Sequence, residues 1–141
     1  MFKVNSIEYN PNLLNFALLI FRVFVGAAMM SHGFPKLMML FSGDKIEFVS
    51  FLGLNDSVSL GLAVFAEFVC SFFLILGLFT RLALIPLIIA MLYAFFGVHF
   101  HDEFGKMELA LFYLVSYILL LVTGPGKFSV DGMTYKKRNA W

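Results

Sequence analysis

Four long apolar stretches constrain this sequence more than any other feature. They cover residues 13–34, 58–79, 82–100 and 107–123. A helix of about 20 residues crosses ~30 Å of hydrocarbon, so each stretch has the length of one membrane crossing. Transmembrane strands would instead alternate polar and apolar residues in pieces of about ten. We therefore predict an all-α fold, an integral membrane four-helix bundle that occupies residues 1–141 as a single domain.

The composition agrees with a membrane protein and excludes several classes of function. Hydrophobic residues make up 61% of the chain and charged residues only 13%, about half of the ~25% charged residues in a typical soluble domain. The net charge of +1 is not the concentration of Lys and Arg that nucleic-acid binding requires. Cys70 is the only cysteine, which excludes an internal disulfide or a dithiol redox pair.

The residues between the apolar stretches predict where the helices end. Pro35 follows the first stretch, and residues 79–81 leave room only for a tight turn between the second and third. The second and third spans should therefore form an antiparallel hairpin. Gly124-Pro125-Gly126 stops the fourth span. Pro86 lies inside the third span, where a membrane bundle tolerates the missing hydrogen bond.

The distribution of basic residues predicts the orientation. An even number of spans places both termini on the same side as the turn at Arg81. That side carries Lys3, Arg81, Lys127, Lys136, Lys137 and Arg138, whereas the opposite side carries Lys36, Lys45 and Lys106. Because cytoplasmic loops are enriched in Lys and Arg, we expect both termini in the cytoplasm.

The long connection at residues 35–57 is expected to hold an element of its own. It has an apolar surface beside Asp44, Lys45 and Glu47, and this pattern predicts a short helix on or re-entering the outer interface. The apolar surface consists of Ile46, Phe48, Val49, Phe51, Leu52 and Leu54. Such a helix could act as a lid or partner contact, or as an interfacial spacer.

Two charged residues, Arg22 and Glu67, lie deep inside predicted spans, where each costs about 2.5–3.5 kcal/mol unless it is paired. Arg22 lies about 14 Å from the start of the first span, and Glu67 about 18 Å from the cytoplasmic end of the second. This similar depth predicts an Arg22–Glu67 ion pair in the bundle core, with a structural role favoured over direct chemistry.

A second polar group is expected at the outer end of the bundle. His32 and Lys36 share one helix face, and His99 and Glu108 reach a similar level. These four residues could form a pocket for a quinone head group, because imidazoles and a carboxylate can hydrogen-bond quinone oxygens and exchange protons. A metal at His99, His101, Asp102 and Glu103 is a weaker alternative. Plain solvation of these side chains at the interface remains open.

Several short motifs together resemble the DoxX family over about residues 14–132. They are Arg22, Gly26, Ser31-His32-Gly33, Lys36, Ala66-Glu67, the run from Gly77 to Ala83, His99, Glu108-Leu109-Ala110-Leu111, Gly124-Pro125-Gly126 and Ser129-Val130-Asp131. The resemblance implies a four-helix protein of the bacterial inner membrane in a quinone-linked redox setting. It also implies that Arg81 and Asp131 are family-motif positions, beside the residues named above.

The leading hypothesis is a small membrane subunit of a quinone-linked oxidoreductase or respiratory-type assembly. We expect an accessory subunit rather than a stand-alone enzyme and assign no catalytic residue, because the chain has neither a nucleotide motif nor a cysteine pair. No cofactor is assigned and quinone is the candidate, whereas other membrane subunits or further copies of the chain are the expected partners. The alternatives are a structural or assembly subunit and a small transporter that uses the intramembrane charges.

Overall fold

The computed structural model describes residues 8–98, 100–101 and 103–138, and its regular elements are helices. In chain order these are α1 (Pro11–Phe41), α2 (Asp56–Val64), the π-helical segment η1 (Phe65–Cys70), α3 (Ser71–Leu76), α4 (Thr80–Tyr93), the π-helical segment η2 (Ala94–Val98), α5 (Phe104–Thr123) and α6 (Val130–Arg138). The prediction of an all-α fold is confirmed.

Within the described residues, four helical segments are long and apolar enough to cross a membrane. They are Pro11–Phe41, Asp56–Leu76, Thr80–Val98 and Phe104–Thr123. Large apolar side chains such as Phe24, Ile85 and Phe112 point outward from these segments, as expected where a helix faces lipid instead of water. The chain is therefore a multi-pass membrane protein in contact with the bilayer.

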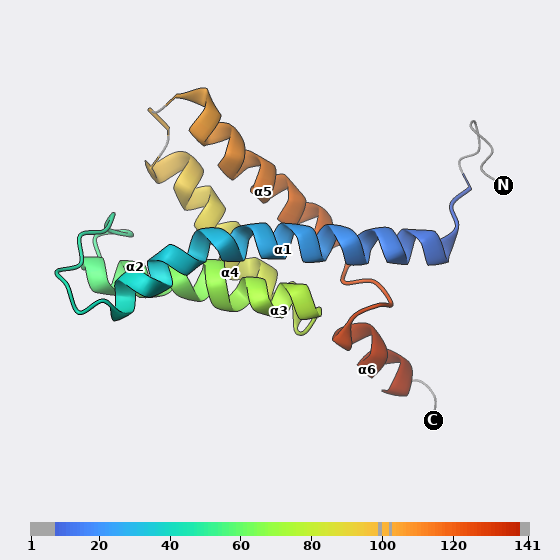
Figure 1. Ribbon diagram of the computed structural model, residues 1–141. Coiled ribbons are helices and arrows are strands. Elements are labelled where there is room, and N and C mark those ends of the chain that lie inside the picture. The colour runs from blue at the N-terminus through green and yellow to red at the C-terminus, as the bar shows by residue number, and fades with distance from the viewer. Residues whose placement is uncertain (1–7, 99, 102, 139–141) are drawn as a thin grey trace.

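The helices form two antiparallel pairs. Figure 1 shows α1 running beside α2, η1 and α3, which form one continuous helical rod that we call the second rod. The α4–α5 hairpin lies against them at a steep angle. The core between the pairs is a cluster of buried side chains that includes Leu74, Leu84, Leu87, Tyr117 and Leu120. The predicted hairpin of the second and third spans is also present, because α3 and α4 are joined by a tight turn at Gly77.

The first helix is longer than the sequence predicts. Asn10 caps its start by accepting hydrogen bonds from the backbone N–H groups of Asn12 and Leu13. Pro35 was expected to end the span, but the helix continues through it to Phe41. A membrane helix tolerates an internal proline because neighbouring helices and local adjustments accommodate the lost hydrogen bond. As a result, Lys36 stays on the same helix face as His32.

Gly33 sets the closest approach between α1 and the second rod. A Cβ atom at this position would lie 2.8 Å from the carbonyl carbon of Glu67 and 2.9 Å from the backbone nitrogen of Phe68. These neighbours are backbone atoms and cannot move aside without shifting a helix. The residue without a side chain therefore fixes the register at which α1 and η1 pack.

This close packing predicts opposite effects for two glycine substitutions. Gly33→Ala should lower the free energy of unfolding by about 1–3 kcal/mol through overpacking. Gly61→Ala, also in a helix but with open space around the new Cβ, should raise it by about 0.5–1 kcal/mol because alanine has the higher helix propensity. Thermal unfolding of the two purified variants tests this contrast. Equal melting temperatures would show that the contact at Gly33 does not fix the packing.

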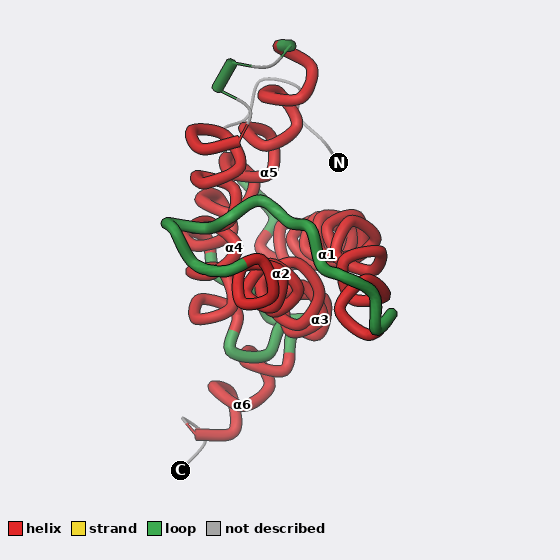
Figure 2. The backbone as a smooth tube through the Cα atoms, turned by 90° about the vertical axis from the view of Figure 1, so that its left-hand side faces the viewer, coloured by secondary structure: helices red, strands yellow, loops and turns green. Residues whose placement is uncertain are grey.

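Residues 42–55 do not form the short helix that the sequence predicts. They follow an irregular path, with Gly43, Leu52 and Gly53 at positive φ angles of 77°, 49° and 81°, a conformation that interrupts a right-handed helix. Figure 2 shows this segment leaving the end of α1, crossing toward α4 and returning to α2. We call residues 42–55 the lid segment, because it covers the cavity described next.

Candidate functional site

An ion pair between α1 and η1 lies at the centre of the candidate site. Lys36 Nζ donates to both carboxylate oxygens of Glu67, at 2.5 and 2.6 Å. Glu67 is only 7% exposed and lies in the π-helical segment, a local widening of the helix that is frequent at functional sites. The pairing neutralises a carboxylate that would otherwise be costly inside a membrane span.

The predicted Arg22–Glu67 ion pair is wrong. Glu67 lies beside Gly33, and the helix rises about 21 Å from Arg22 to Lys36. The depth estimate failed because it assumed that the first two spans begin and end at the same levels. Instead, Arg22 lies beside Gly77 at the end of α3, so the first turns of α1 extend beyond the α3–α4 turn.

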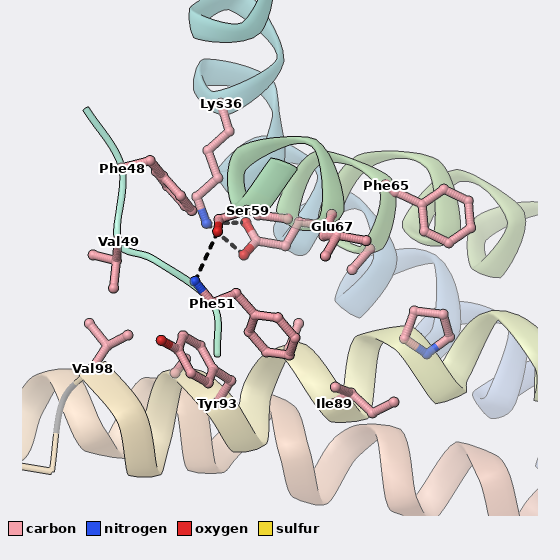
Figure 3. A pocket seen from close by; sticks show the side chains of 16 residues that line it. Lys36, Phe48, Val49, Phe51, Ser59, Phe65, Glu67, Ile89, Tyr93 and Val98 are labelled. Carbon is pink, nitrogen blue, oxygen red and sulfur yellow. Dashed lines mark hydrogen bonds and ion pairs between the residues drawn. The ribbon is translucent and has the colours of Figure 1, made fainter. Parts of the chain in front are cut away.

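A large, mainly apolar cavity of about 440 Å³ lies beside the ion pair. Figure 3 shows Lys36 and Glu67 on one side of this cavity, with Ile89 and Tyr93 of α4 opposite them. The lining residues come from α1, the lid segment, α2, η1, α4 and η2: Lys36, Phe48, Val49, Phe51, Ser59, Leu62, Ala63, Phe65, Ala66, Glu67, Pro86, Ile89, Ala90, Tyr93, Ala94 and Val98. We call this space the large cavity.

Specific contacts hold the lid segment over the large cavity. The backbone N–H of Phe51 donates to Ser59 Oγ at 2.9 Å, and the Tyr93 hydroxyl donates to the Ser50 carbonyl oxygen at 2.5 Å. The rings of Phe51 and Tyr93 make an edge-to-face contact with centroids 4.6 Å apart. The segment thus meets both α2 and α4, which supports its interpretation as a lid.

A smaller cavity of about 140 Å³ lies on the other side of the ion pair. His32, Lys36 and Glu67 line it together with Lys106 and Tyr113 of α5, and apolar side chains complete it. The His32 and Tyr113 rings are in edge-to-face contact, with centroids 6.0 Å apart. We call this space the small cavity.

The predicted outer pocket is therefore assembled only in part. The structure brings His32 and Lys36 together with Glu67, which the sequence had assigned to a different pair. Glu108 is exposed and lines neither cavity. His99 lies outside the described residues, as does Asp102 of the alternative metal site. Among the described residues, no group of three or more His, Cys, Asp and Glu side chains is placed to hold a metal ion.

Sequence reasoning missed three contributors to the large cavity. Tyr93 and Ser59 lie within apolar stretches, and their roles depend on contacts with the lid segment that no spacing rule reveals. Phe51 was recognised only as part of an apolar surface. The one available signal was the set of large apolar residues in an otherwise polar connection, which is unusual for an exposed loop.

Arg22 organises a second polar cluster near the α3–α4 turn. It is 1% exposed, and its two terminal nitrogens donate to the carbonyl oxygens of Pro125 at 2.6 Å and Phe128 at 2.9 Å. These acceptors belong to the connection between α5 and α6, which Figure 1 places at the opposite end of the second rod from the lid segment. Arg22 thus anchors the chain after the last span.

Asp131 ties α6 to the beginning of α4. Its two carboxylate oxygens accept hydrogen bonds from the backbone N–H groups of Phe79 at 2.9 Å and Thr80 at 2.8 Å. Its own backbone N–H donates to the Gly77 carbonyl oxygen. Asp131 therefore caps the start of a helix far from it in sequence, whereas Arg81 is exposed.

Because Asp131 caps α4, shortening its side chain to alanine should moderately lower the stability of the protein. Asp131→Ala removes the acceptors for both N–H groups and should lower the free energy of unfolding by about 1–2 kcal/mol. Asp44→Ala, at an exposed position in the lid segment, is the matched control and should change it by less than about 0.5 kcal/mol. Thermal unfolding in the same detergent compares the two, and equal losses would contradict the assignment of the cap.

Comparison with known proteins identifies the family. The DoxX family model matches residues 17–100. A relative from Haemophilus influenzae, an uncharacterized protein, is 33% identical over 146 residues, which covers 95% of this chain and 100% of the relative. No solved structure matches this chain. The family match covers more than half of the sequence and includes Arg22, His32, Lys36, Glu67 and Arg81, so the chain belongs to the DoxX family.

Proposed function

We propose that this protein is a small membrane subunit of a quinone-linked oxidoreductase and that its large cavity binds the quinone. The observation that carries this proposal is the apolar cavity of about 440 Å³ with the Lys36–Glu67 pair in its wall. Ligand cavities typically have volumes of ~300–1,000 Å³ and combine an apolar lining with a few oriented polar groups. The size and lining of the large cavity fit this description.

The polar groups of the cavity match the chemistry of a quinone head group. A quinone has carbonyl oxygens that accept hydrogen bonds, and the Lys36 ammonium, which uses two of its three N–H bonds on Glu67, has one donor left for such an oxygen. A quinol has hydroxyl groups that donate instead, and the Glu67 carboxylate and the Tyr93 hydroxyl oxygen, whose own O–H donates to the Ser50 carbonyl oxygen, are acceptors. Both redox forms of the head group therefore have suitable hydrogen-bonding groups along one cavity.

The opening of the cavity suits a ligand with a long apolar tail. Leu62 and Phe65 on one side and Ile89 on the other line the cavity and are also about half exposed on the apolar surface of the spans. A head group in the cavity could therefore leave its tail among the lipid chains, passing between the second rod and α4. A water-soluble ligand would gain nothing from this lateral opening.

Electron transfer would require a partner protein. The sequence holds one cysteine and shows no nucleotide-binding motif, so the electrons exchanged with a quinone would come from or go to a redox centre on another subunit. In this arrangement the present chain binds the quinone and provides hydrogen-bonding and proton-accepting groups.

Quinone content after purification in lipid nanodiscs tests the proposal. We expect close to one quinone per protein in the wild type, measured by solvent extraction and chromatography. Ala63→Phe fills the large cavity, whereas Ala27→Phe lies on the exposed face of α1 and lines neither cavity. Ala63→Phe should lose most of its quinone, because a loss of only about 1.4 kcal/mol of binding energy already lowers the affinity tenfold. Ala27→Phe should keep its quinone.

Two outcomes would contradict the proposal. If the wild type carries no quinone, even when quinone is added in excess, the large cavity does not bind it. If a stoichiometric protein without a redox centre is purified with a chain that lacks quinone, the protein is a structural or assembly subunit instead.

A further inference from the structure

The Lys36–Glu67 pair forms a wall between two cavities. Both side chains, together with Ala94, line the large cavity and the small cavity. Lys36 donates to both oxygens of the carboxylate, so the pair acts as one bridging unit across α1 and η1. A group in this position contacts a ligand on one side and a separate space on the other.

The two cavities differ in what surrounds them. The large cavity is closed by the lid segment and by apolar side chains, and it opens beside Phe65 and Ile89 on the apolar surface of the spans. The small cavity is lined by His32 and Lys106, which are both exposed polar residues. Lys106 lies in the first turn of α5, at the end of a span. The small cavity therefore reaches the surface where water is available.

We propose that Glu67 is a proton-transfer residue, which exchanges protons with water through the small cavity and with a bound ligand in the large cavity. The connection between Glu67 and water follows from the two cavities alone. The nature of the ligand rests on the proposed function, since a quinone gains or loses protons when it changes its redox state.

Each step of the proposed path moves one proton and leaves the backbone in place. When a ligand hydroxyl donates its proton, the O–H bond of the ligand breaks and an O–H bond forms on Glu67. The Glu67 O–H bond then breaks toward a water molecule in the small cavity, from which the proton passes to the His32 imidazole or to bulk water. Proton transfer of this kind needs groups within hydrogen-bond reach or linked by one water.

The other polar groups near the carboxyl favour this path. Lys36 and His32 face the small cavity from α1, while Lys106 and Tyr113 face it from α5. On the large-cavity side the polar side chains are Ser59 of α2 and Tyr93 of α4. Glu67 is the one carboxylate among the described residues that line either cavity, so it is the acceptor available to both.

Infrared spectroscopy of the Glu67 carboxyl tests the path. In Lys36→Met the buried carboxylate loses its counter-charge and should take up a proton, giving a protonated-carboxyl band that disappears in Lys36→Met/Glu67→Gln. On transfer to D₂O this band shifts as the proton is exchanged for deuterium. Difference spectra of the wild type against Glu67→Gln follow the same carboxyl beside an intact Lys36.

Matched variants then distinguish the two cavities. Ala110→Leu fills the small cavity alone and Ala63→Leu the large cavity alone. We expect Ala110→Leu to slow deuterium exchange at least about tenfold, because proton transfer fails beyond the reach of one water, and Ala63→Leu to leave it unchanged. His32→Phe, at an exposed position, should also slow exchange and serves if Ala110→Leu does not fold.

Each other result has a definite meaning. The proton path would be overturned by any of three results. These are slower exchange in Ala63→Leu alone, equal effects of Ala63→Leu and Ala110→Leu on exchange, and the absence of a Glu67 band. Added quinone should shift the band if the large cavity binds it. If the band does not shift while Ala110→Leu still slows exchange, the proposed function fails and the proton path stands.

Discussion

Lys36→Met should lower the free energy of unfolding by about 2–4 kcal/mol at neutral pH. Removing one member of a buried ion pair typically costs ~3–5 kcal/mol because the other charge stays buried without compensation. The Lys36 side chain is 29% exposed, so water reduces this cost. The measurement is unfolding in SDS or by heat, with the protein in a defined detergent.

The pH dependence of Lys36→Met provides a second test of the same cause. The folded variant holds the Glu67 carboxyl in a site that favours its neutral form, so the folded state should bind a proton more readily than the unfolded state. Stability then rises as the pH falls, and the loss relative to the wild type should shrink in acid. A loss that does not change with pH would point to lost packing of the lysine side chain instead.

Two controls separate the ion pair from the general effect of losing a lysine. Lys36→Met/Glu67→Gln removes both charges. It should lower the free energy of unfolding by less than the single variant Lys36→Met does, because no charge remains uncompensated. Lys45→Met breaks an exposed pair with Glu47, whose N–O distance is 3.4 Å, and should cost less than about 1 kcal/mol. A double variant less stable than Lys36→Met would contradict the explanation.

Arg22→Met should lower the free energy of unfolding by about 3–5 kcal/mol, because each hydrogen bond to a charged donor contributes ~1.5–3 kcal/mol. The guanidinium is buried and donates to the carbonyl oxygens of Pro125 and Phe128. Methionine has a similar volume but cannot donate, so both carbonyl groups lose these hydrogen bonds. The connection between α5 and α6 should then become accessible to protease.

The measurement combines unfolding with limited proteolysis of the segment after α5. Arg81→Met is the matched control, because Arg81 lies at the same end of the bundle but is exposed. It should leave both stability and the protease pattern close to those of the wild type. Equal protection of the segment in Arg22→Met and the wild type would show that Arg22 does not anchor it.

The four spans could be predicted because membrane crossings depend on local composition. Runs of about 20 apolar residues are sufficient to identify them, and the predicted limits differ from the observed ones by a few residues, except at the end of α1. That helix passes through Pro35 because a bundle can accommodate the missing hydrogen bond. A local rule for helix ends could not anticipate this tertiary effect.

The charged residues were correctly recognised as unusual, but their contacts depend on register. The sequence indicated that Arg22 and Glu67 needed compensation. It could not show that Gly33 sets the alignment of α1 with η1, which places Lys36 at Glu67. Arg22 donates to backbone carbonyl groups. A search of the sequence for side chains of opposite charge cannot find such acceptors.

The most direct test of quinone binding in the large cavity is photo-crosslinking with an azido-quinone in nanodiscs, followed by mass spectrometry of the modified peptides. If the large cavity binds quinone, labels should fall on residues that line it, such as Val49, Ala63 and Tyr93, and excess unmodified quinone should prevent this labelling. Labels that spread over the lipid-facing residues Phe24 and Phe112 and are unaffected by unmodified quinone would contradict a quinone site in this cavity.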